Sequence, residues 1–588
     1  MLLPSSLSDS TCRKHGWWML LVLTAVLYLP GLGTLPLMDR DEPRFAHATV
    51  EMMQRGAWVI PYFNSDPKVS DATRIEQMRA GKGAMEVGYR FDKPPLTYWW
   101  MRLHYTLFGV NEFAARLHSV IAVWLVALVT FGLASRLAGG RAGLVAGLAW
   151  LTTLQVIVHG RLCVADMPMV FFVTLACRAI VECLVLADQD SALSTKHSAL
   201  PAPYWPWTLH LSLGLGFLAK GPIALLVPAL ALLLMRFAFW RKPLPWRRLK
   251  LWPGLLLALA IIAAWGIPAL VETQGLYWKV GMQEHVVERG AKALNGRFPV
   301  PGYYLAMAFL SLFPWIALLP WVWSRVRETW DTSKAFLVSW LAAPYLIFTF
   351  YATQLPHYVM PGFPAAMVLL AICAPELGTL SKFQSRWRSV VLLILPLPLL
   401  AAATGLFILP LTRPYAPACF AFALGLGIWS QAWVRQKGFL LAALGLMLFI
   451  CSLAMVSSQL RVSHPAVHLA EEAGSLPEKT ELLGWQFDEP SLVYYFDRPW
   501  KFPGKIETVV DHLNRKGPRV VVLLRREWTL DRLLKDWWAG KADLTPKNDA
   551  SQKVDELIAT HPDYKVSASS GLDDARSSWV ELRMLVRR

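Results

Sequence analysis

The chain has 588 residues, of which 55% are hydrophobic and only 17% are charged, and its formal net charge is +17. Soluble globular proteins are about 25% charged, so this composition excludes disordered, fibrous and disulfide-framework proteins and argues against a soluble enzyme. From Gln459 onward, 20 Lys and Arg residues balance 20 Asp and Glu residues, so the basic surplus lies entirely in the apolar part. A surplus placed there is typical of membrane topology and not of nucleic-acid binding.

Apolar stretches long enough to cross a bilayer recur over most of the chain. We therefore predict an α-helical polytopic membrane domain over residues 1–457, with about thirteen transmembrane helices. The first apolar stretch follows Arg13-Lys14 and has no small-residue cleavage site, which indicates an uncleaved span. The predicted spans are 17–35, 113–135, 143–160, 167–186, 206–219, 222–239, 252–271, 302–323, 335–352, 358–376, 389–410, 415–434 and 439–457.

Loop charges predict the orientation of these spans independently. With the N-terminus in the cytoplasm, sixteen Lys and Arg residues fall in the cytoplasmic loops, against Arg161, Lys220 and Arg413 in the short outer loops. This asymmetry is the positive-inside pattern, which favours a multi-pass protein of the cytoplasmic (inner) membrane. An odd number of spans then places the C-terminal part outside, on the same side as the long loops 36–112 and 272–301.

Residues 458–588 are predicted to form a small extracytoplasmic α/β domain, because short alternating or apolar runs are separated by turn residues. The seven cysteines form no Cys-x-x-Cys pair and six of them lie in or beside apolar segments, so they are expected to be small buried side chains. Strands are expected at Glu481–Phe487, Ser491–Phe496, Arg519–Leu524 and Trp579–Val586, and helices at Ile506–Lys516 and Trp528–Trp538.

Charged motifs stand at the outer ends of several spans. Asp41 and Arg44 lie in the sequence DEPR directly after the first span. Two interpretations fit this motif: a carboxylate base beside an Arg that binds phosphate, or an interfacial cluster of charges without a function. Asp92 and Lys93 precede Pro94-Pro95, which stops a helix and fixes a turn at the interface. Without further information this second motif is equally a membrane re-entry signal.

Three further residues lie on the same predicted side. Asp166, in RLCVADMP, adds a second carboxylate, although Pro168 also suits a helix N-terminus at which Asp166 is a cap. His285, in QEHVVER, is a candidate metal ligand or a structural histidine. Tyr358, in QLPHYVMP, fits an interfacial aromatic anchor as well as a binding residue.

In chain order, the motifs DEPRFA, FDKPPLTYW, RLCVADMP, AKGP, QEH and HYVMPGFPA resemble those of bacterial GT-C integral-membrane glycosyltransferases. The similarity is to aminoarabinose (ArnT-like) transferases and protein O-mannosyltransferases, and it extends over roughly residues 17–375. It implies a GT-C transmembrane catalytic domain that moves a sugar from a polyprenyl-phosphate (undecaprenyl-phosphate) donor to a lipid A, glycan or protein acceptor. Transfer would occur at the outer face of the membrane, with inversion.

The resemblance also implies roles for the motif residues. The two catalytic carboxylates would be Asp41 and Asp166. The donor phosphate would be bound by Arg44, Lys93 and Tyr358, and a divalent metal ion by Asp92 and His285. The chain departs from the family pattern in three places: Asp92 stands where Glu is usual, Glu288 stands where an Arg is common, and residues 65–90 look like an insertion.

A membrane transporter or lipid flippase is the alternative function, and a scaffold whose C-terminal domain recruits a partner is a third. Transporters carry ionisable residues near the bilayer midplane, whereas the charges here gather at the outer ends of spans. Arg178 and Glu182 are an exception, and their i,i+4 spacing fits a structural ion pair. A scaffold would leave the acidic motifs unexplained.

Overall fold

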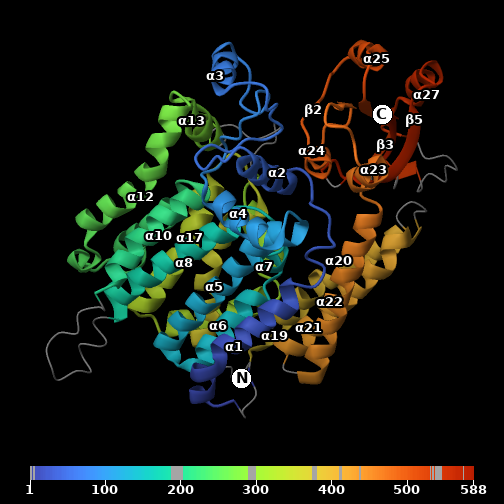
Figure 1. Cartoon of the computed structure of the whole chain (residues 1–588). Helices are drawn as coiled ribbons and strands as arrows, with labels where there is room; N and C mark the ends of the chain where they lie inside the picture. The colour runs from blue at the N-terminus through green and yellow to red at the C-terminus, as the bar shows by residue number, and fades with distance from the viewer. Residues whose placement is uncertain are drawn as a thin grey trace.

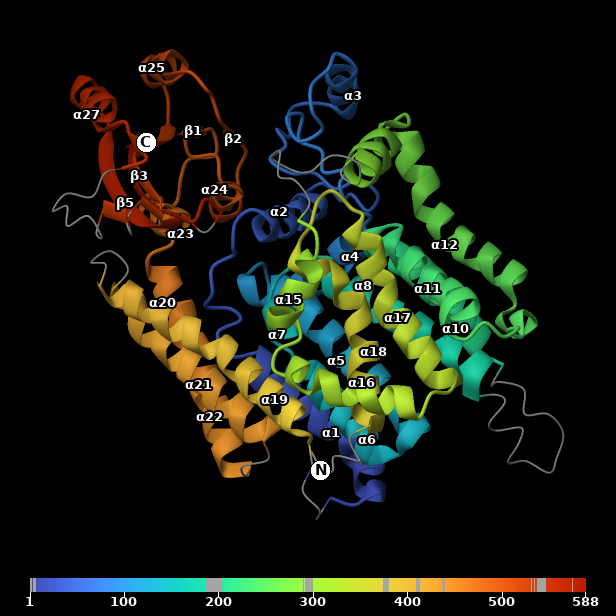
Figure 2. The same cartoon turned by 180° about the vertical axis from the view of Figure 1, so that it is seen from behind.

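The computed structural model divides into a large helical part and a smaller domain built around a β-sheet, which lies at the upper right of Figure 1. The N-terminus lies at one end of the helical part, and the sheet domain that holds the C-terminus lies at the opposite end (Figures 1 and 2). The structure describes Leu3 and residues 7–186, 203–288, 290, 300–373, 380–408, 413–435, 439–529, 531–532, 535–536, 546–573 and 575–588.

The helical part contains a helix in each of the thirteen apolar segments that the sequence predicted. Its first elements are α1 (Asp9–Tyr28), α2 (Asp41–Gln54), α3 (Asp71–Arg79), α4 (Leu96–Phe108), α5 (Glu112–Ala138), α6 (Gly140–Leu151), α7 (Leu154–His159), α8 (Asp166–Val181), η1 (Glu182–Leu186), α10 (Trp205–Lys220), α11 (Ile223–Leu234), η2 (Met235–Phe239), η3 (Trp246–Leu249) and α12 (Leu251–Glu272). The remainder are α13 (Leu276–Trp278), η4 (Lys279–Glu288), α15 (Tyr303–Ser311), η6 (Trp315–Leu318), α16 (Leu319–Glu328), α17 (Thr332–Thr349), η7 (Pro356–Gly362), α18 (Phe363–Cys373), α19 (Lys382–Ile394), α20 (Pro396–Ile408), η9 (Arg413–Tyr415), α21 (Ala416–Val434) and α22 (Phe439–Val462).

Length and composition single out the helices that can cross a membrane. Among the described residues, 6 helical stretches pass this test, and up to 7 if the bent pair Tyr303–Ser311 and Trp315–Glu328 is one span. The two helices of that pair meet at 106°. The predicted class, a polytopic α-helical membrane protein with a small C-terminal α/β domain, is confirmed, while the count of thirteen spans stays a prediction.

The first helix corrects the expected bounds of the first span. It begins at Asp9, eight residues before the apolar run, because the side chain of Ser8 accepts a hydrogen bond from the first turn as an N-cap. It ends at Tyr28, because Pro30 and Gly31, which has a φ of +72°, turn the chain. Residues 29–35 therefore belong to the connection that leads into the first outer loop.

Small residues allow the central helices to approach each other closely. At Gly143 in α6, an added Cβ would lie 2.6 Å from the carbonyl oxygen of Phe131 in α5. At Gly147, one turn further, it would lie 2.7 Å from a methyl group of Leu20 in α1. Since lipid does not drive apolar helices together, such close backbone packing is what holds membrane helices against each other.

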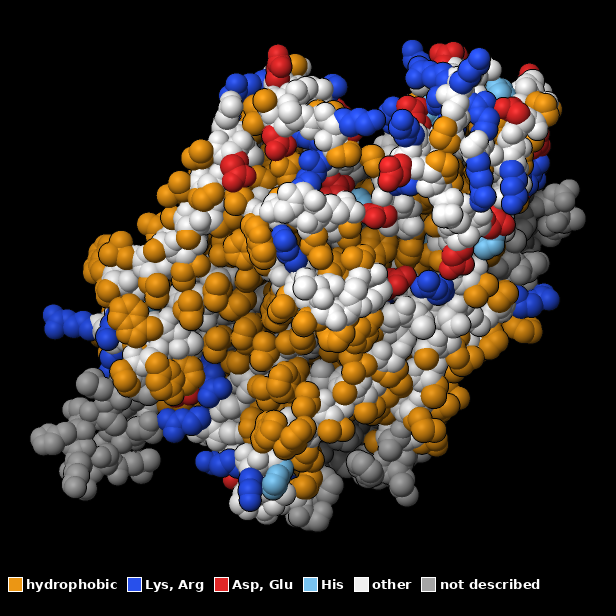
Figure 3. All heavy atoms as spheres, in the orientation of Figure 1, with side chains coloured by type: hydrophobic (Ala, Val, Ile, Leu, Met, Phe, Trp, Pro, Cys, Tyr) orange, Lys and Arg blue, Asp and Glu red, His pale blue; other side chains and the backbone are white. Residues whose placement is uncertain are grey.

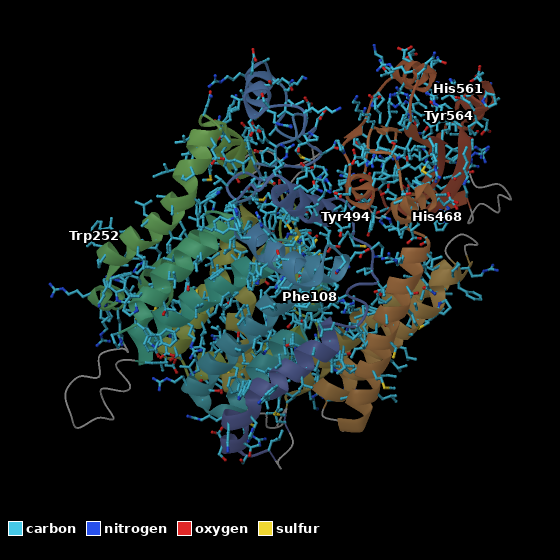
Figure 4. The ribbon with its side chains drawn as sticks, viewed as in Figure 1. Phe108, Trp252, His468, Tyr494, His561 and Tyr564 are labelled. Carbon is cyan, nitrogen blue, oxygen red and sulfur yellow. The ribbon has the colours of Figure 1, made fainter. Side chains whose placement is uncertain are left out.

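The outer surface of the helical part is apolar. In Figure 3, hydrophobic side chains cover the middle of the molecule over α5, α10 and α12, and acidic side chains gather at the end that carries α3 and the sheet domain. Trp252, at the outer edge of α12 (Figure 4), is 83% exposed. A soluble protein rarely exposes an apolar surface this large, so this belt is the face that lipid covers.

The C-terminal domain is a mixed sheet with helices on both faces. The order of its strands is β2-β1-β3-β6-β5, with β4 beside β3; β1 is parallel to β2 and β3, whereas β6 is antiparallel to β3 and β5. Val520, Val522 and Leu524 of β3 pack on one face, and Val521 and Leu523 on the other. Helices cover both faces, which is why this strand is apolar along its length. The elements are α23 (Pro465–Ala473), β1 (Glu481–Trp485), α24 (Pro490–Phe496), β2 (Trp500–Lys501), α25 (Ile506–Asn514), β3 (Arg519–Thr529), β4 (Asn548–Asp549), α27 (Ser551–Thr560), β5 (Lys565–Asp573) and β6 (Ser578–Arg587).

One prediction for this domain is wrong, and a second is wrong at its start. Residues Ser491–Phe496 form helix α24 and not a strand, because Pro490 at the first helical position starts a helix that their aromatic and branched residues continue. Trp528 and Thr529 belong to the end of β3 and not to a helix. Residues 531–532 and 535–536 are helical, as predicted, and the other positions of that predicted helix lie outside the described residues.

Candidate functional site

Asp41 is the first residue of α2, at the end of the helical part that faces the C-terminal domain (Figure 1). Its side chain is exposed, and within the described part of the chain no hydrogen bond or ion pair occupies it. It does interact electrostatically with Arg44 and Arg90. The helix N-terminus adds a partial positive charge at this position. Asp41 is therefore an accessible carboxylate beside two cations.

Arg44 lies one turn further along α2. Its Nε is buried and has no hydrogen-bond partner among the described residues. Burial and then the neighbouring Arg90 lower the pKa of Arg44, while Asp41 and Asp92 oppose that shift. A buried guanidinium nitrogen without a partner is costly, so this arrangement suits a group that an anionic ligand completes.

Asp92 and Lys93 lie in the loop before α4, next to Arg90. The Nε of Arg90 is 3.0 Å from Asp92 and donates at 2.9 Å to the hydroxyl of Tyr98. Burial alone would lower the pKa of Arg90, but Asp92, Tyr98 and Asp41 outweigh it and raise that pKa. The Nζ of Lys93 lies 3.5 Å from Asp92 and is partly exposed. Arg90 thus orients the side chain of Asp92, while the Nζ of Lys93 donates to the backbone carbonyl of Asp92 at 2.9 Å.

The aromatic ring of Tyr277 anchors this loop from the second long outer loop. The Tyr277 hydroxyl donates to the backbone carbonyl of Lys93 at 2.5 Å, and its ring lies 4.9 Å from that of Phe91. The predicted insertion, residues 65–90, continues the aromatic row, because Tyr89 stacks on Phe91 at 4.7 Å. At the base of the insertion, Tyr62 and Tyr89 both donate to Asp71, at 3.0 and 2.9 Å.

Glu42, next to Asp41, is a structural residue. Its carboxylate accepts from Arg116 of α5 at 2.7 and 2.8 Å, and both side chains are buried. Arg116 also donates to the carbonyls of Leu32, Leu35 and Pro36 in the connection before α2. This buried pair fixes the position from which α2 begins.

A second group of titratable side chains, the Asp166 cluster, consists of Asp166, Lys220, His159 and His357. Each member stands at or near the end of a helical element: the start of α8, the end of α10, the end of α7 and the start of η7. Asp166 is buried and pairs with Lys220, and it lies 3.7 Å from the Nε2 of His357. The rings of His159 and His357 lie 4.5 Å apart. The cluster therefore holds a carboxylate between a lysine and a histidine pair.

Two hydrogen bonds connect the surroundings of the two sites. The backbone N–H of Cys163, three residues before Asp166, donates to Glu42 at 2.7 Å. The hydroxyl of Thr97, in the first turn of α4, donates at 3.4 Å to the carbonyl of Ala219, the residue directly before Lys220. The predicted carboxylates Asp41 and Asp166 thus lie at the same end of the helical part.

Tyr358 lies in η7 beside the Asp166 cluster, and the Nζ of Lys220 is 5.6 Å from the centre of its ring. Its contact with the donor phosphate stays a prediction. The side chain of His285 lies outside the described residues, although η4 contains that position. In the described ranges no three His, Cys, Asp or Glu side chains form a metal-binding group. Asp92 is already neutralised by Arg90 and Lys93, so the described residues by themselves do not make a metal site, and the predicted divalent-ion site stays a prediction.

Sequence reasoning missed four members of these groups: Arg90, Lys220, His159 and His357. His159 and Lys220 stand directly before the helix-ending glycines Gly160 and Gly221, and His357 follows Pro356, the first residue of η7. The signal that could have found these three is a titratable side chain beside a glycine or proline at the end of a helix. The helix ends of a bundle lie together at its surface. Arg90 has no such signal, since its role depends on the tertiary contacts that bring it close to Asp41 and Arg44 of α2.

The C-terminal domain carries a buried acidic group near the site. Arg576 donates to Glu489 at 2.9 Å and lies 3.4 Å from Asp573, and Glu489 also acts electrostatically on Arg44. Burial and then the charge of Glu489 raise the pKa of Asp573 to about 7. An unfolded Asp titrates near about 4. Between these values the folded domain binds a proton that the unfolded chain does not, so stability falls as pH rises through this range.

We therefore expect Asp573→Asn to weaken the pH dependence of stability. In the unchanged protein, this group contributes to a higher Tm at pH 5 than at pH 8, and the amide removes that contribution because it does not titrate. The measurement is the thermal unfolding of the whole protein in detergent at both pH values. Asp511→Asn, at an exposed position of α25, is the control. An unchanged difference in Tm between the two pH values in Asp573→Asn would contradict the prediction.

Comparisons with known proteins show what the chain resembles. A family model described as dolichyl-phosphate-mannose-protein mannosyltransferase matches residues 92–267. The chain is 30% identical to the undecaprenyl phosphate-alpha-4-amino-4-deoxy-L-arabinose arabinosyl transferase of Edwardsiella ictaluri, over 60% of this chain and 59% of that protein. It is 28% identical to the protein of the same name from Pseudomonas paraeruginosa, over 72% of each chain. The chain thus spans about three fifths of the length of the first of these relatives.

The similarity in fold covers nearly the whole chain. The crystal structure of ArnT from Cupriavidus metallidurans bound to undecaprenyl phosphate matches with a TM-score of 0.69 and 20% sequence identity, over 97% of this chain and 98% of that chain. The protein is therefore a polytopic helical membrane protein that resembles the ArnT-like transferases in sequence, and the resemblance drawn from its motifs is confirmed. Its fold is that of the ArnT structure, including the C-terminal domain.

Proposed function

We propose that the protein is a glycosyltransferase that moves a sugar from a polyprenyl-phosphate donor to an acceptor at the outer face of the cytoplasmic membrane. One observation carries this proposal: Asp41 lies beside Arg44 and Arg90 at a helix N-terminus, with Lys93 in the adjoining loop. The names of the two relatives, which describe an undecaprenyl phosphate sugar and its transferase, support the same donor class.

The cations serve the leaving group. When the bond between sugar and phosphate breaks, negative charge grows on the phosphate oxygens, and cations held in place lower the energy of that state. Arg44 offers a buried Nε without a partner in the described part of the chain, and Lys93 offers a partly exposed ammonium. Arg90, held by Asp92 and Tyr98, keeps the loop in position and adds positive charge.

The carboxylates serve the acceptor. A hydroxyl acceptor must lose a proton as it attacks the anomeric carbon, and Asp41 is the first candidate for the base, since it is exposed and unpaired in the described ranges. Asp166 is the second candidate, although its pairing with Lys220 makes it better suited to orient the acceptor. A phosphate acceptor is already ionised and needs only positioning. Attack opposite the leaving phosphate inverts the anomeric centre.

The position of the site supports the topology that the loop charges predict. Helix α2, which begins at Asp41, and the C-terminal domain lie at one end of the helical part, and the N-terminus lies at the other end (Figure 1). Hydrogen bonds to α2 and α4 place the Asp166 cluster at the same end as α2. With the N-terminus in the cytoplasm, the site faces the outer leaflet. The prenyl chain then lies in lipid, while the sugar and an acceptor such as lipid A, a glycan or a protein hydroxyl reach the site from water.

Incubation of the purified protein with a panel of undecaprenyl-phosphate sugars tests the proposal. The expected result is release of free undecaprenyl phosphate when an acceptor extract is present, and no release without it. Intact lipid-linked sugar that crosses a vesicle membrane without release of the lipid phosphate would support the flippase alternative. If no sugar gives either release of the lipid phosphate or crossing of the membrane, both functions are contradicted.

We expect Lys93→Ala to weaken use of the donor more than use of the acceptor. The ammonium of Lys93 is proposed to contact the donor phosphate, and loss of a preorganised charge at a reacting oxygen costs about 10²-fold in rate. The measurement is the donor and acceptor dependence of initial rates. Lys82→Ala, an exposed lysine in the same outer loop, is the matched control and should leave both unchanged. Equal effects of Lys93→Ala on donor and acceptor would count against a phosphate contact.

A further inference from the structure

The C-terminal domain and the membrane part share a core at their junction. Helix α24 packs along α2, and the ring of Tyr494 lies in one hydrophobic cluster with Leu37 and Phe45 of the membrane part. In return, Phe63 of the first outer loop lies in the core of the C-terminal domain. Figure 4 shows Tyr494 at this junction and Tyr564 away from it, on the outer side of the C-terminal domain. The two parts are therefore interlocked and not merely tethered.

Two hydrogen bonds attach the residues directly before Asp41 to α24. The side chain of Asp39 accepts from the backbone N–H of Ser491, in the first turn of α24, at 2.8 Å. The backbone N–H of Leu37 donates to the hydroxyl of Tyr495 at 2.9 Å. One helix of the C-terminal domain thus holds the chain on both sides of residue 38.

Tyr495 is fixed from the membrane part as well. Its hydroxyl donates to Glu112, the first residue of α5, at 3.3 Å. Arg461, near the end of α22, donates to the same carboxylate oxygen at 2.8 Å. The hydroxyl therefore joins the start of one helix, the end of another and the loop that leads to Asp41.

The same helix brings charge to the site. Glu489, directly before α24, is buried and held by Arg576, and it acts electrostatically on Arg44 of α2. Its carboxylate opposes the effect that burial has on Arg44. Docking of α24 thus sets both the geometry in front of Asp41 and the electrostatic surroundings of the neighbouring cation.

We propose that α24 is a positioning element of the site and that Tyr495 is its positioning residue, which acts on catalysis through Leu37 and Asp41. The inference rests on the proposed function in one respect, the role of Asp41 in transfer. Its physical basis is that a misplacement of about 1 Å at a reacting group costs about 10²-fold in rate. The C-terminal domain is then a working part of the site.

Tyr495→Phe tests the proposal, because the ring stays in the core and only the hydroxyl is lost. We expect kcat to fall about tenfold while the KM for the donor changes little, since Arg44 and Lys93 remain in place. Tyr564→Phe is the matched control: it also removes a buried hydroxyl from the C-terminal domain, one that donates to the carbonyl of Leu513 at 2.8 Å, far from this loop. Its kcat should be unchanged.

Asp39→Ala removes the second attachment. The double variant combines Asp39→Ala with Tyr495→Phe. If both attachments act through the same loop, its fold-loss in kcat should be smaller than the product of the two single fold-losses. Thermal unfolding of each variant establishes that it folds. Equal kcat values for Tyr495→Phe, Tyr564→Phe and the unchanged protein would overturn the proposal.

Hydrogen exchange separates this proposal from the proposed function. The backbone N–H of Leu37 should exchange faster in Tyr495→Phe than in Tyr564→Phe, because its hydrogen-bond acceptor is gone. That result is independent of any sugar donor. Faster exchange in a protein without transfer activity would retain the positioning role and reject the function, whereas unchanged exchange at residues 36–41 would reject the positioning role itself.

Discussion

Replacement of Asp41 with Asn is expected to lower the rate of sugar transfer by about 10³-fold, while the protein still folds into the membrane. The amide keeps the size of the side chain but accepts no proton, and a well-placed base contributes about 10²–10⁴-fold to a rate. Because Asp41 is exposed and makes no hydrogen bond or ion pair within the described ranges, its replacement should cost little stability. The measurement is the initial rate of release of undecaprenyl phosphate, beside the Tm of the same sample.

Glu76→Gln is a suitable control, because Glu76 is an exposed carboxylate on α3 in the same outer loop. It should change neither rate nor Tm. Near-normal transfer by the Asp41→Asn protein would remove Asp41 from the role of base and leave Asp166 as the remaining candidate. Loss of activity together with a large loss of Tm would point to a structural role instead.

The second large effect is expected from Arg116→Leu, which should destabilise the protein by about 3–5 kcal/mol. The substitution leaves the buried carboxylate of Glu42 without its partner and removes the donor from three backbone carbonyls before α2. Buried charges and carbonyls without partners carry the full cost of desolvation. Thermal unfolding in detergent and the yield of folded protein measure the effect.

Arg136→Leu, in the same helix α5, is the matched control. Arg136 lies 3.7 Å from Glu182, but its side chain is 44% exposed, so water screens the pair. Its loss is expected to cost about 1 kcal/mol or less. Similar losses of stability in the two variants would contradict a special contribution of the buried pair with Glu42.

The sequence predicted the helical membrane part well, because a run of about 20 apolar residues has few alternatives to a helix in lipid. Strands were also predicted at Glu481–Phe487, Arg519–Leu524 and Trp579–Val586, where β1, β3 and β6 lie, since local alternation and apolar runs report burial directly. The prediction of a strand at Ser491–Phe496 was wrong. Aromatic residues favour a strand there, but Pro490 stands at the first position of a helix, where its fixed φ favours helix formation.

For the site, the order of short motifs along the chain was enough to bring Asp41, Asp92, Lys93 and Asp166 into consideration. Their arrangement was not, because it depends on contacts between residues far apart in sequence. Glu42 bonds the backbone of Cys163, and Thr97 bonds that of Ala219, and no local pattern announces either contact.

The sequence by itself therefore determined the class of protein, the apolar segments and the residues that carry charge at the ends of helices, because hydrophobicity and helix-ending residues act locally. Only the tertiary structure decided which of these charges are structural and which stay open to a ligand. Glu42 and Arg116 neutralise each other in the core, whereas Asp41, one residue earlier, remains exposed beside Arg44. The reason is geometric: the helix turns by about 100° per residue, so neighbouring carboxylates face different surroundings.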